Sequence, residues 1–177
     1  LWKVVTGESS SSFEEMHWQR ASIAWSPDAQ QIAFGARAAG GDRLYIVDSH
    51  TGRRLHTYNF GFDGMSSPDW SPDGDKIVFV GVKNGRSDLY ILNLPDESVE
   101  RLTNDLFDES DPKWSPDGTR IVFSSDRAPG VVDSSAQLLY QTYDVYLIDL
   151  ATKDLRRLTD DPRDDLSPTW GPDGRHI

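Results

Sequence analysis

The stretch Pro112-Lys113-Trp114-Ser115-Pro116-Asp117-Gly118-Thr119-Arg120-Ile121-Val122-Phe123 has a close copy earlier in the chain, Pro68-Asp69-Trp70-Ser71-Pro72-Asp73-Gly74-Asp75-Lys76-Ile77-Val78-Phe79. A third copy runs from Ile23 to Phe34, and a fourth begins at Pro168 and reaches Ile177. The tryptophans of successive copies, at positions 25, 70, 114 and 170, are 45, 44 and 56 residues apart. Self-similarity at a fixed period of this length is typical of a modular array of structural repeats.

The Ser-Pro-Asp-Gly segment of each copy has the composition of a tight hairpin turn. Proline presets the backbone of the first corner, Asp suits the second, and Gly takes the left-handed conformation that completes a three-residue loop. The first copy has Ala29 instead of Gly. A positive φ at this alanine would cost about 1 kcal/mol, so we expect that turn to take another form. We expect the Asp of each turn to cap the turn itself.

A second pair of strands follows each tryptophan hairpin. Its first strand is expected at 44–48, 88–94 and 144–150, and its second strand at 53–56, 100–103 and 156–159. These runs are rich in β-branched and aromatic residues and are bounded by turn residues, as strands are. No segment shows a sustained helical period. The sequence therefore predicts an all-β chain of four-stranded antiparallel units.

A four-stranded unit that repeats every 40 to 45 residues or so is the sequence form of a β-propeller blade. We expect the tryptophan strand to be innermost and the Arg-x-Leu-Thr strand outermost. Complete blades are expected at 21–62, 63–106 and 107–162, the last with an insertion at 128–142. Residues 1–20 would hold the last strand of a preceding blade and a loop, and 163–177 the first hairpin of the next. Closed propellers have about four to eight blades, so we expect an interior piece of a longer protein.

Composition narrows the classes of function. Eighteen basic against 29 acidic residues give a formal charge of −11, which argues against nucleic acid or an anionic membrane surface as the partner. The absence of cysteine excludes thiolate catalysis, disulfides and zinc–thiolate sites. No apolar run reaches the roughly 18 residues of a membrane-spanning helix, so no membrane insertion is expected.

The residues that could carry chemistry favour a structural interpretation. The four tryptophans share one repeat position, and Tyr45, Tyr90 and Tyr146 share another, so we expect all seven to be core residues. The histidines, in contrast, fall at unrelated repeat positions: His17, His50, His56 and His176. No nucleophile elbow, calcium loop or metal-ligand spacing is present. We therefore expect no catalytic residue, no metal and no cofactor.

The repeat pattern P-x-W-S-P-D-G-x-x-I-x-F, then D-x-Y-x-x-D, then R-x-L-T, resembles the WD-repeat-like propeller repeat of the TolB family of cell-envelope proteins. The resemblance covers nearly all of residues 21–177. It implies a non-catalytic binding or scaffolding module in a periplasmic or extracellular location. Similar repeats occur in prolyl-oligopeptidase-type and tricorn-like peptidases. The alternative is therefore a propeller that gates substrate access to a hydrolase domain absent from this chain; a lyase with a histidine metal site is a third.

The loops are the candidates for a partner-binding site. In propellers of this kind, the lead-in loop before each first strand opens on the same face as the loop between the second and third strands. We predict that a partner contacts the charged residues of the lead-in loops and the apolar residues of the insertion: Arg20, Asp63, Asp108, Glu109, Asp164, Asp165, Leu138, Leu139 and Tyr140. The alternatives are ordinary solvated charge and an insertion that folds back on its own blade.

The chemistry of these loops predicts the kind of partner. Carboxylates around a channel mouth favour a basic protein or peptide segment, or a cation in the channel. Other chains that complete the ring are a further expected partner, because an open ring leaves strand edges unpaired.

Overall fold

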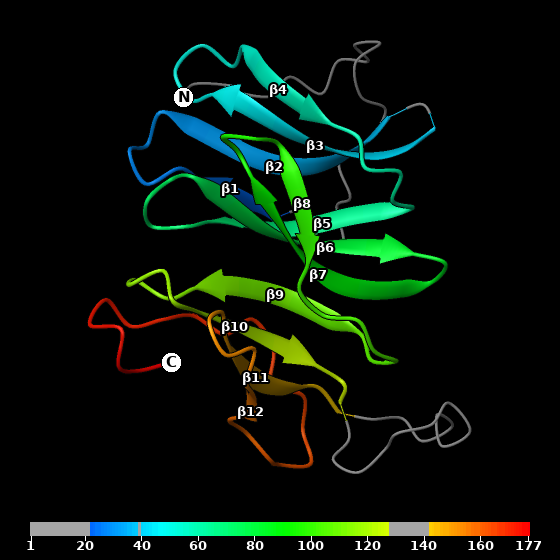
Figure 1. Ribbon diagram of the computed structural model, residues 1–177, viewed down its shortest axis with the longest axis vertical. Coiled ribbons are helices and arrows are strands. Elements are labelled where there is room, and N and C mark those ends of the chain that lie inside the picture. Colours follow the sequence, from blue (N-terminus) through cyan, green and yellow to red (C-terminus); the bar gives the residue numbers. More distant parts are fainter. Residues whose placement is uncertain (1–21, 39, 128–141) are drawn as a thin grey trace.

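The computed structural model describes residues 22–38, 40–127 and 142–177, and they form three four-stranded antiparallel sheets (Figure 1). The first blade contains β1 (Ile23–Trp25), β2 (Gln31–Ala38), β3 (Gly41–Asp48) and β4 (Arg54–Tyr58). The second contains β5 (Gly64–Trp70), β6 (Lys76–Lys83), β7 (Arg86–Asn93) and β8 (Ser98–Arg101). The third contains β9 (Glu109–Trp114), β10 (Arg120–Ser125), β11 (Asp144–Asp149) and β12 (Leu155–Arg157).

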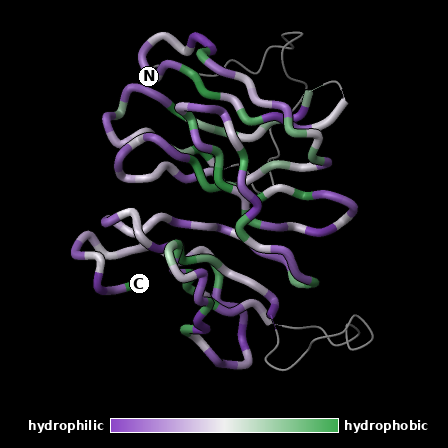
Figure 2. Tube along the Cα trace, in the orientation of Figure 1, coloured by the Kyte–Doolittle hydropathy of each residue, from purple (hydrophilic) through white to green (hydrophobic). Residues whose placement is uncertain are grey.

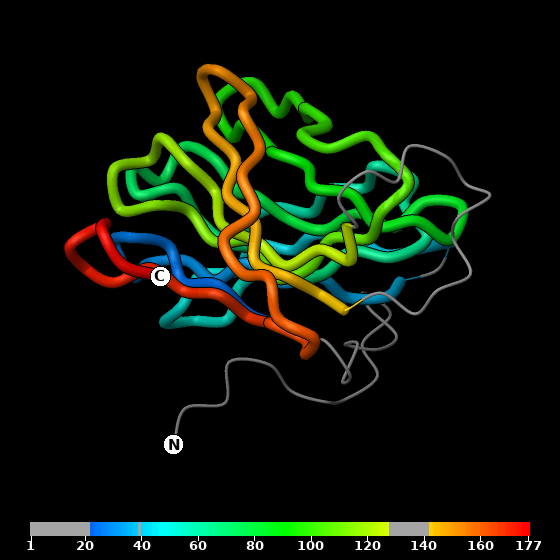
Figure 3. Tube along the Cα trace, turned by 90° about the horizontal axis from the view of Figure 1, so that it is seen from below, coloured from blue at the N-terminus to red at the C-terminus, as the bar shows by residue number. Residues whose placement is uncertain are grey.

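The sheets are arranged as consecutive propeller blades. Strands pair in chain order within each sheet, and the first strand of one blade packs on the sheet of the blade before it. Among the described strands, the outer strands β4, β8 and β12 each lie beside the third strand of their own sheet and beside no strand of another blade. Seen from below, the third blade lies in front of the other two (Figure 3). The predicted all-β propeller architecture, with the tryptophan strand innermost, is confirmed. The described residues contain no helix, and hence none that could span a membrane.

Two interfaces between blades form most of the core. The first and second blades meet through apolar and aromatic side chains, among them Phe62 and Tyr90, whose ring centroids are 4.5 Å apart. The second and third blades meet around Trp114, Ile121 and Phe123. Apolar residues follow the second and third strands of the sheets, whereas the turns are hydrophilic (Figure 2). The predicted tyrosine core is confirmed, since Tyr45, Tyr90 and Tyr146 are all buried.

The repeated tryptophans pack on the preceding blade. Trp70 and Trp114 are buried, and the indole nitrogen of Trp70 donates to the carbonyl of Ala24 at 3.2 Å. Trp170 makes the same bond to the carbonyl of Lys113, also at 3.2 Å. Trp25 is 54% exposed, so the core prediction is wrong for this residue in the described structure. The reason is that Trp70 and Trp114 pack on the blade before their own, whereas the described residues include no blade before β1.

The Ser-Pro-Asp-Gly turns form as the sequence predicts. In the third blade, the Ser115 hydroxyl donates to Asp117 Oδ1 at 2.6 Å and accepts from the backbone of Arg120 at 2.9 Å. The bond from Ser115, together with bonds from the hydroxyl and the backbone N–H of Thr119, holds the pKa of Asp117 down at about 2. Ala29 does not change the turn: its φ is +58°, and its N–H donates to the Ser26 carbonyl as Gly118 does to Ser115. The prediction of another turn form is therefore wrong.

The turns of successive blades also touch one another. A Cβ placed on Gly118 would lie 3.3 Å from the ring of Pro72 in the preceding turn, and one on Gly74 would lie 3.8 Å from Pro27. The fourth turn closes as well, since Gly174 donates to the carbonyl of Gly171 at 3.0 Å. The same end of every blade therefore carries a row of stacked turns.

Candidate functional site

The lead-in loops and the connections between second and third strands meet at the other end of the blades. Asp63, before β5, donates its N–H to Val82 and accepts at Oδ2 from the backbone of Asn84, both at 2.9 Å. Before β9, Asp108 donates its N–H to the Asp126 carboxylate at 2.7 Å. These bonds bring the two kinds of loop onto one face, which we call the lead-in face.

The lead-in aspartates also fasten neighbouring blades together. Asp108 Oδ1 accepts from the backbone and the hydroxyl of Ser87 in the second blade, at 2.9 and 2.8 Å. Asp164 Oδ1 accepts from the backbone of Tyr143 in the third blade at 2.9 Å. Between the first two blades the carboxylate belongs to the earlier blade instead: Asp42 Oδ2 of the first blade accepts from the Met65 N–H of the second. One carboxylate oxygen of Asp63, of Asp108 and of Asp164 is thus held by a backbone N–H, which fixes its position.

Glu109 lies beneath the lead-in face, inside the joint between the second and third blades. Its side chain is fully buried and pairs with Arg127 at 2.7 Å. Its other oxygen accepts from the Thr103 hydroxyl at 2.9 Å, and Thr103 Oγ1 in turn accepts from Leu89 N–H. Burial raises the pKa of Glu109 to about 8, against the opposing pull of Arg127. Glu109 is therefore part of a buried network and does not reach the surface.

Arg127 joins this network to the root of the insertion. Its guanidinium contacts Asp105 at 2.5 Å in addition to Glu109. It also lies over aromatic rings, 5.5 Å from the centroid of Phe123 and 5.7 Å from that of Tyr146. The Tyr146 hydroxyl donates to its carbonyl at 2.8 Å. Arg127, the last residue before the insertion, is therefore held in place beside the lead-in loop of the third blade.

The predicted site residues have different positions in the structure. Asp63 and Asp164 are exposed on the lead-in face, whereas Asp108 and Asp165 are half-buried there. Arg20, Leu138, Leu139 and Tyr140 lie outside the described residues.

Three further aspartates on this face were missed by sequence reasoning. Asp160 and Asp161 are exposed, and Asp126 is half-buried, with its pKa raised by burial and by nearby Asp108. Asp160 pairs with Arg157 at 2.9 Å, and Asp161 accepts from the backbone of Arg163. The acidic run from 160 to 165 could have identified two of them. We call Asp126, Asp160, Asp161 and Asp164 the acidic rim.

The described histidines are not arranged for catalysis. His50 Nδ1 lies 3.1 Å from Ser49 Oγ, but the neighbouring Asp48 carboxylate accepts from backbone N–H groups of the turn. His56 stacks on Tyr58, and His176 pairs with Asp173 in an exposed turn. Within the described ranges, no cluster of three or more His, Cys, Asp or Glu could hold a metal ion.

Comparison with known proteins agrees with the repeat pattern. The family model described as the TolB beta propeller domain matches residues 7–142. The chain belongs to the TolB β-propeller family. A search of curated protein sequences gave no match.

Solved TolB structures share the fold. TolB from Acinetobacter baumannii is 28% identical with a TM-score of 0.68, over 87% of this chain and 35% of that one. The putative TolB from Agrobacterium tumefaciens is 26% identical with a TM-score of 0.69, over 87% of this chain and 55% of that one. The chain thus spans about a third to a half of these TolB proteins. The tricorn protease, 16% identical with a TM-score of 0.62 over 82% of this chain and 14% of its own, shows the fold alone.

The motif residues of this TolB propeller are accounted for by blade construction. In the second and third blades, the aspartate of the D-x-Y motif forms an ion pair with the arginine that stands two positions before the threonine of the R-x-L-T motif. The pairs are Asp88–Arg101 and Asp144–Arg157, each at 2.6 Å. The threonine accepts from the third strand, since Val145 N–H donates to Thr159 at 2.9 Å. The motifs therefore identify the family without indicating a ligand.

Proposed function

We propose that this TolB-type propeller is a non-catalytic protein-binding module whose partner presents a basic segment to the lead-in face. The observation that supports the proposal is the acidic rim, whose four carboxylates lie on the lead-in face, in the third blade and in the loop that follows it. The chain also carries a net charge of −11, and a field of one sign steers a partner of opposite charge.

The hydrogen bonds of the rim make it a rigid recognition surface. Asp164 and Asp161 each use one carboxylate oxygen for a backbone N–H and keep the other for a partner. Fixed carboxylates lose little side-chain entropy when a cation binds. Arg163 in the same loop offsets part of the charge, so lysines of a partner would best approach from the side of Asp126 and Asp160.

Exposed ion pairs are worth under about 1 kcal/mol each, so the rim sets the association rate more than the affinity. An apolar contact has to supply most of the affinity. The insertion residues Leu138, Leu139 and Tyr140 are our candidates for that contact, because the insertion begins directly after Arg127 on this face. We also infer a periplasmic location, because the chain belongs to the TolB family of cell-envelope proteins. Cell fractionation tests this inference.

The experiment measures association of the full-length protein with a synthetic lysine- and leucine-rich peptide by stopped-flow fluorescence. We expect Asp160→Asn with Asp161→Asn to slow association about fivefold at low salt, and the difference to vanish near 0.5 M salt. The matched control, Asp75→Asn with Asp154→Asn, removes the same charge from turns at the opposite end of the blades. Equal effects of the two double variants, or no effect of either, would contradict a role for the lead-in face.

The peptidase alternative remains a prediction from the sequence. Solved peptidase propellers such as the AtxE2 isopeptidase and the tricorn protease are 18% and 16% identical to this chain and share the fold.

A further inference from the structure

Trp114 departs from the bonding rule that its equivalents follow. Trp70 and Trp170 each donate their indole N–H to the residue before the tryptophan of the preceding blade. For Trp114 the corresponding acceptor would be the carbonyl of Asp69, but the Trp114 indole nitrogen is buried without a hydrogen-bond partner. Asp69 instead uses its carboxylate to accept from the backbone N–H of Trp114 at 2.9 Å. A buried donor without an acceptor is costly, and in a native protein it needs an explanation.

The unpaired indole borders a pocket of about 330 Å³ between the second and third blades. Small-molecule sites usually begin at about 300 Å³. Ile91 and Leu150 form apolar walls, and Asn93 and Ser98 add polar groups. These residues lie at or beside the ends of β6, β7, β8 and β11 that carry the turns, so the pocket opens away from the lead-in face. It is therefore independent of the function proposed above.

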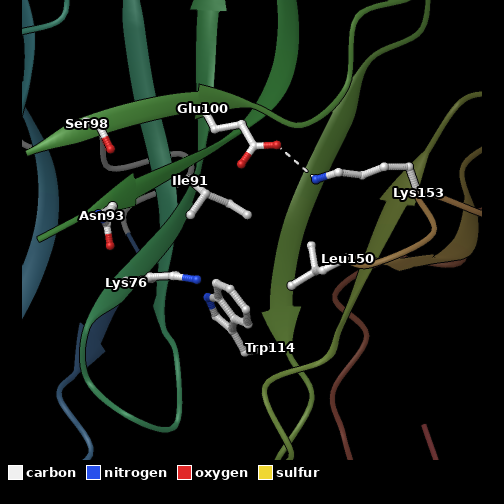
Figure 4. A pocket seen from close by; sticks show the side chains of 8 residues that line it. All are labelled: Lys76, Ile91, Asn93, Ser98, Glu100, Trp114, Leu150 and Lys153. Carbon is white, nitrogen blue, oxygen red and sulfur yellow. Dashed lines mark hydrogen bonds and ion pairs between the residues drawn. The ribbon is translucent and has the colours of Figure 1, made fainter.

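The charges at the pocket are mainly cationic. Lys76 and Trp114 both line the pocket, and the ammonium end of Lys76 points toward the indole ring of Trp114 (Figure 4). Lys76 is exposed and lies within ion-pair distance of no carboxylate among the described residues, although the hydrogen bond from Ser71 and, to a lesser extent, the charge of Lys76 lower the pKa of Asp73 in the adjoining turn. Lys153 crosses the opening and pairs with Glu100 of the second blade at 2.8 Å. Two hydrogen-bond donors, one of them charged, thus line the same pocket, and neither bonds to an acceptor among the described residues.

We propose that this pocket binds the carboxylate end of a peptide whose last side chain is aliphatic. One carboxylate oxygen would accept from the Trp114 indole N–H and the other from the Lys76 ammonium group. The aliphatic side chain would lie against Ile91 and Leu150. A charge-assisted bond to a carboxylate satisfies both donors at once, which neither water nor a neutral group does as well.

The charged side chains at the opening of the pocket are exposed and can move to admit a ligand. The end of Lys76 points toward the Trp114 indole, and this side chain is long and exposed (Figure 4). The Lys153–Glu100 pair across the opening is also exposed, at 48% and 60% of the two side chains. Exposed pairs of this kind add little stability, so a ligand can displace the bridge.

The test uses the full-length protein and N-acetyl-leucine as the probe, with N-acetyl-leucinamide as the uncharged control. Indole N–H resonances of ¹⁵N-labelled protein report on each tryptophan, and Trp114→Phe assigns the Trp114 resonance. We expect N-acetyl-leucine to shift this resonance downfield with a dissociation constant of about 1 to 10 mM, and the amide to bind at least about tenfold more weakly. The Trp70 resonance, already bonded to Ala24, should stay in place and confirms that each variant is folded.

Two substitutions separate the proposed contacts from general binding. Lys76→Met should weaken the binding of N-acetyl-leucine at least about fivefold, while the binding of N-acetyl-leucinamide stays unchanged. Glu100→Gln, which releases Lys153 from its ion pair, should strengthen the binding of N-acetyl-leucine about twofold. The proposal is overturned if the Trp114 resonance does not move at about 20 mM ligand. It is equally overturned if acid and amide shift it alike, or if Lys76→Met binds as the unmodified protein does.

Discussion

Ala29 occupies a backbone conformation that suits glycine. Its φ of +58° matches those of Gly74, Gly118 and Gly174, because the turn and its contact with the neighbouring blade fix the backbone whichever residue is present. An L-residue in this conformation costs about 1 to 2 kcal/mol, part of which glycine would give back through its freer unfolded chain.

We therefore expect Ala29→Gly to raise the free energy of unfolding by about 0.5 to 1 kcal/mol in urea titrations. The reverse change, Gly74→Ala, serves as the control and should lower it by about 1 kcal/mol, since a Cβ there meets Pro27 only at 3.8 Å. A stabilising Gly74→Ala would contradict this account of the turn.

Glu109 makes stability depend on pH in the opposite sense to an ordinary paired carboxylate. Burial raises its pKa in the folded protein to about 8, above the ordinary value of 4.5 for a glutamate side chain. Between these values the folded state holds a proton that the unfolded state has lost. Stability from this group is therefore complete in acid and falls as pH rises from about 4.5 to 8.

We expect Glu109→Gln to flatten the pH dependence of the unfolding free energy between pH 5 and 8, where the slope due to this group is at most about 1.4 kcal/mol per pH unit. Asp117→Asn provides the contrast. The pKa of Asp117 is lowered, so its effect should occur only as pH falls below about 4. An unchanged slope in Glu109→Gln would show that Glu109 is already ionised at pH 5.

The innermost strands β5 and β9 are joined by a link that the other blades lack. The Asp69 carboxylate accepts from Trp114 N–H and from the Lys113 ammonium group, both at 2.9 Å. Burial raises the pKa of Asp69, although Lys113 opposes the rise. The equivalent residue in the first blade is Ala24, so alanine itself fits this position of a blade.

We expect Asp69→Ala to cost about 1 to 3 kcal/mol, because it leaves the Trp114 N–H without its acceptor. Lys113→Met keeps that bond and should cost clearly less. Urea unfolding followed by tryptophan fluorescence measures both. Equal losses would mean that the ion pair, rather than the backbone bond, joins the strands.

The sequence predicted those features that are determined within a single blade, but not those that depend on contacts with the neighbouring blade. The turns, the tryptophan positions and the buried tyrosines recur in every copy, so their structural role could be read from the repeat. The orientation of an individual lead-in carboxylate depends on the neighbouring blade. Asp108 and Glu109 are adjacent, yet Asp108 is half-buried on the lead-in face and Glu109 is fully buried. Repeat alignment held the missing information: Glu109 and buried Met65 both stand five residues before their tryptophan.

The ends of the blade series differ from its interior. Trp70 and Trp114 are 8% and 7% exposed, whereas Trp25, at the same repeat position, is 54% exposed beside Ile23 at 52%. At the far end Leu166 is 52% exposed. Apolar surface of this kind in a series of blades is suited to being covered by another blade.

We expect the 177-residue chain, studied alone, to self-associate through these faces, and sedimentation velocity at several concentrations to detect it. Ile23→Thr combined with Trp25→Thr should reduce the association. A monodisperse, cooperatively melting monomer of the unsubstituted chain would contradict this expectation.

The order of strands within each sheet has a consequence for how the protein is made. Every strand of the three described sheets pairs with its neighbour along the chain. Ribosomes add about 5 to 20 residues per second, so one blade emerges every few seconds, whereas a hairpin forms in about 1 to 10 microseconds. Each sheet can close long before the next is synthesised. Only the packing of one blade on the next has to wait, and a growing chain therefore exposes the apolar face of its newest blade until the following blade has been made.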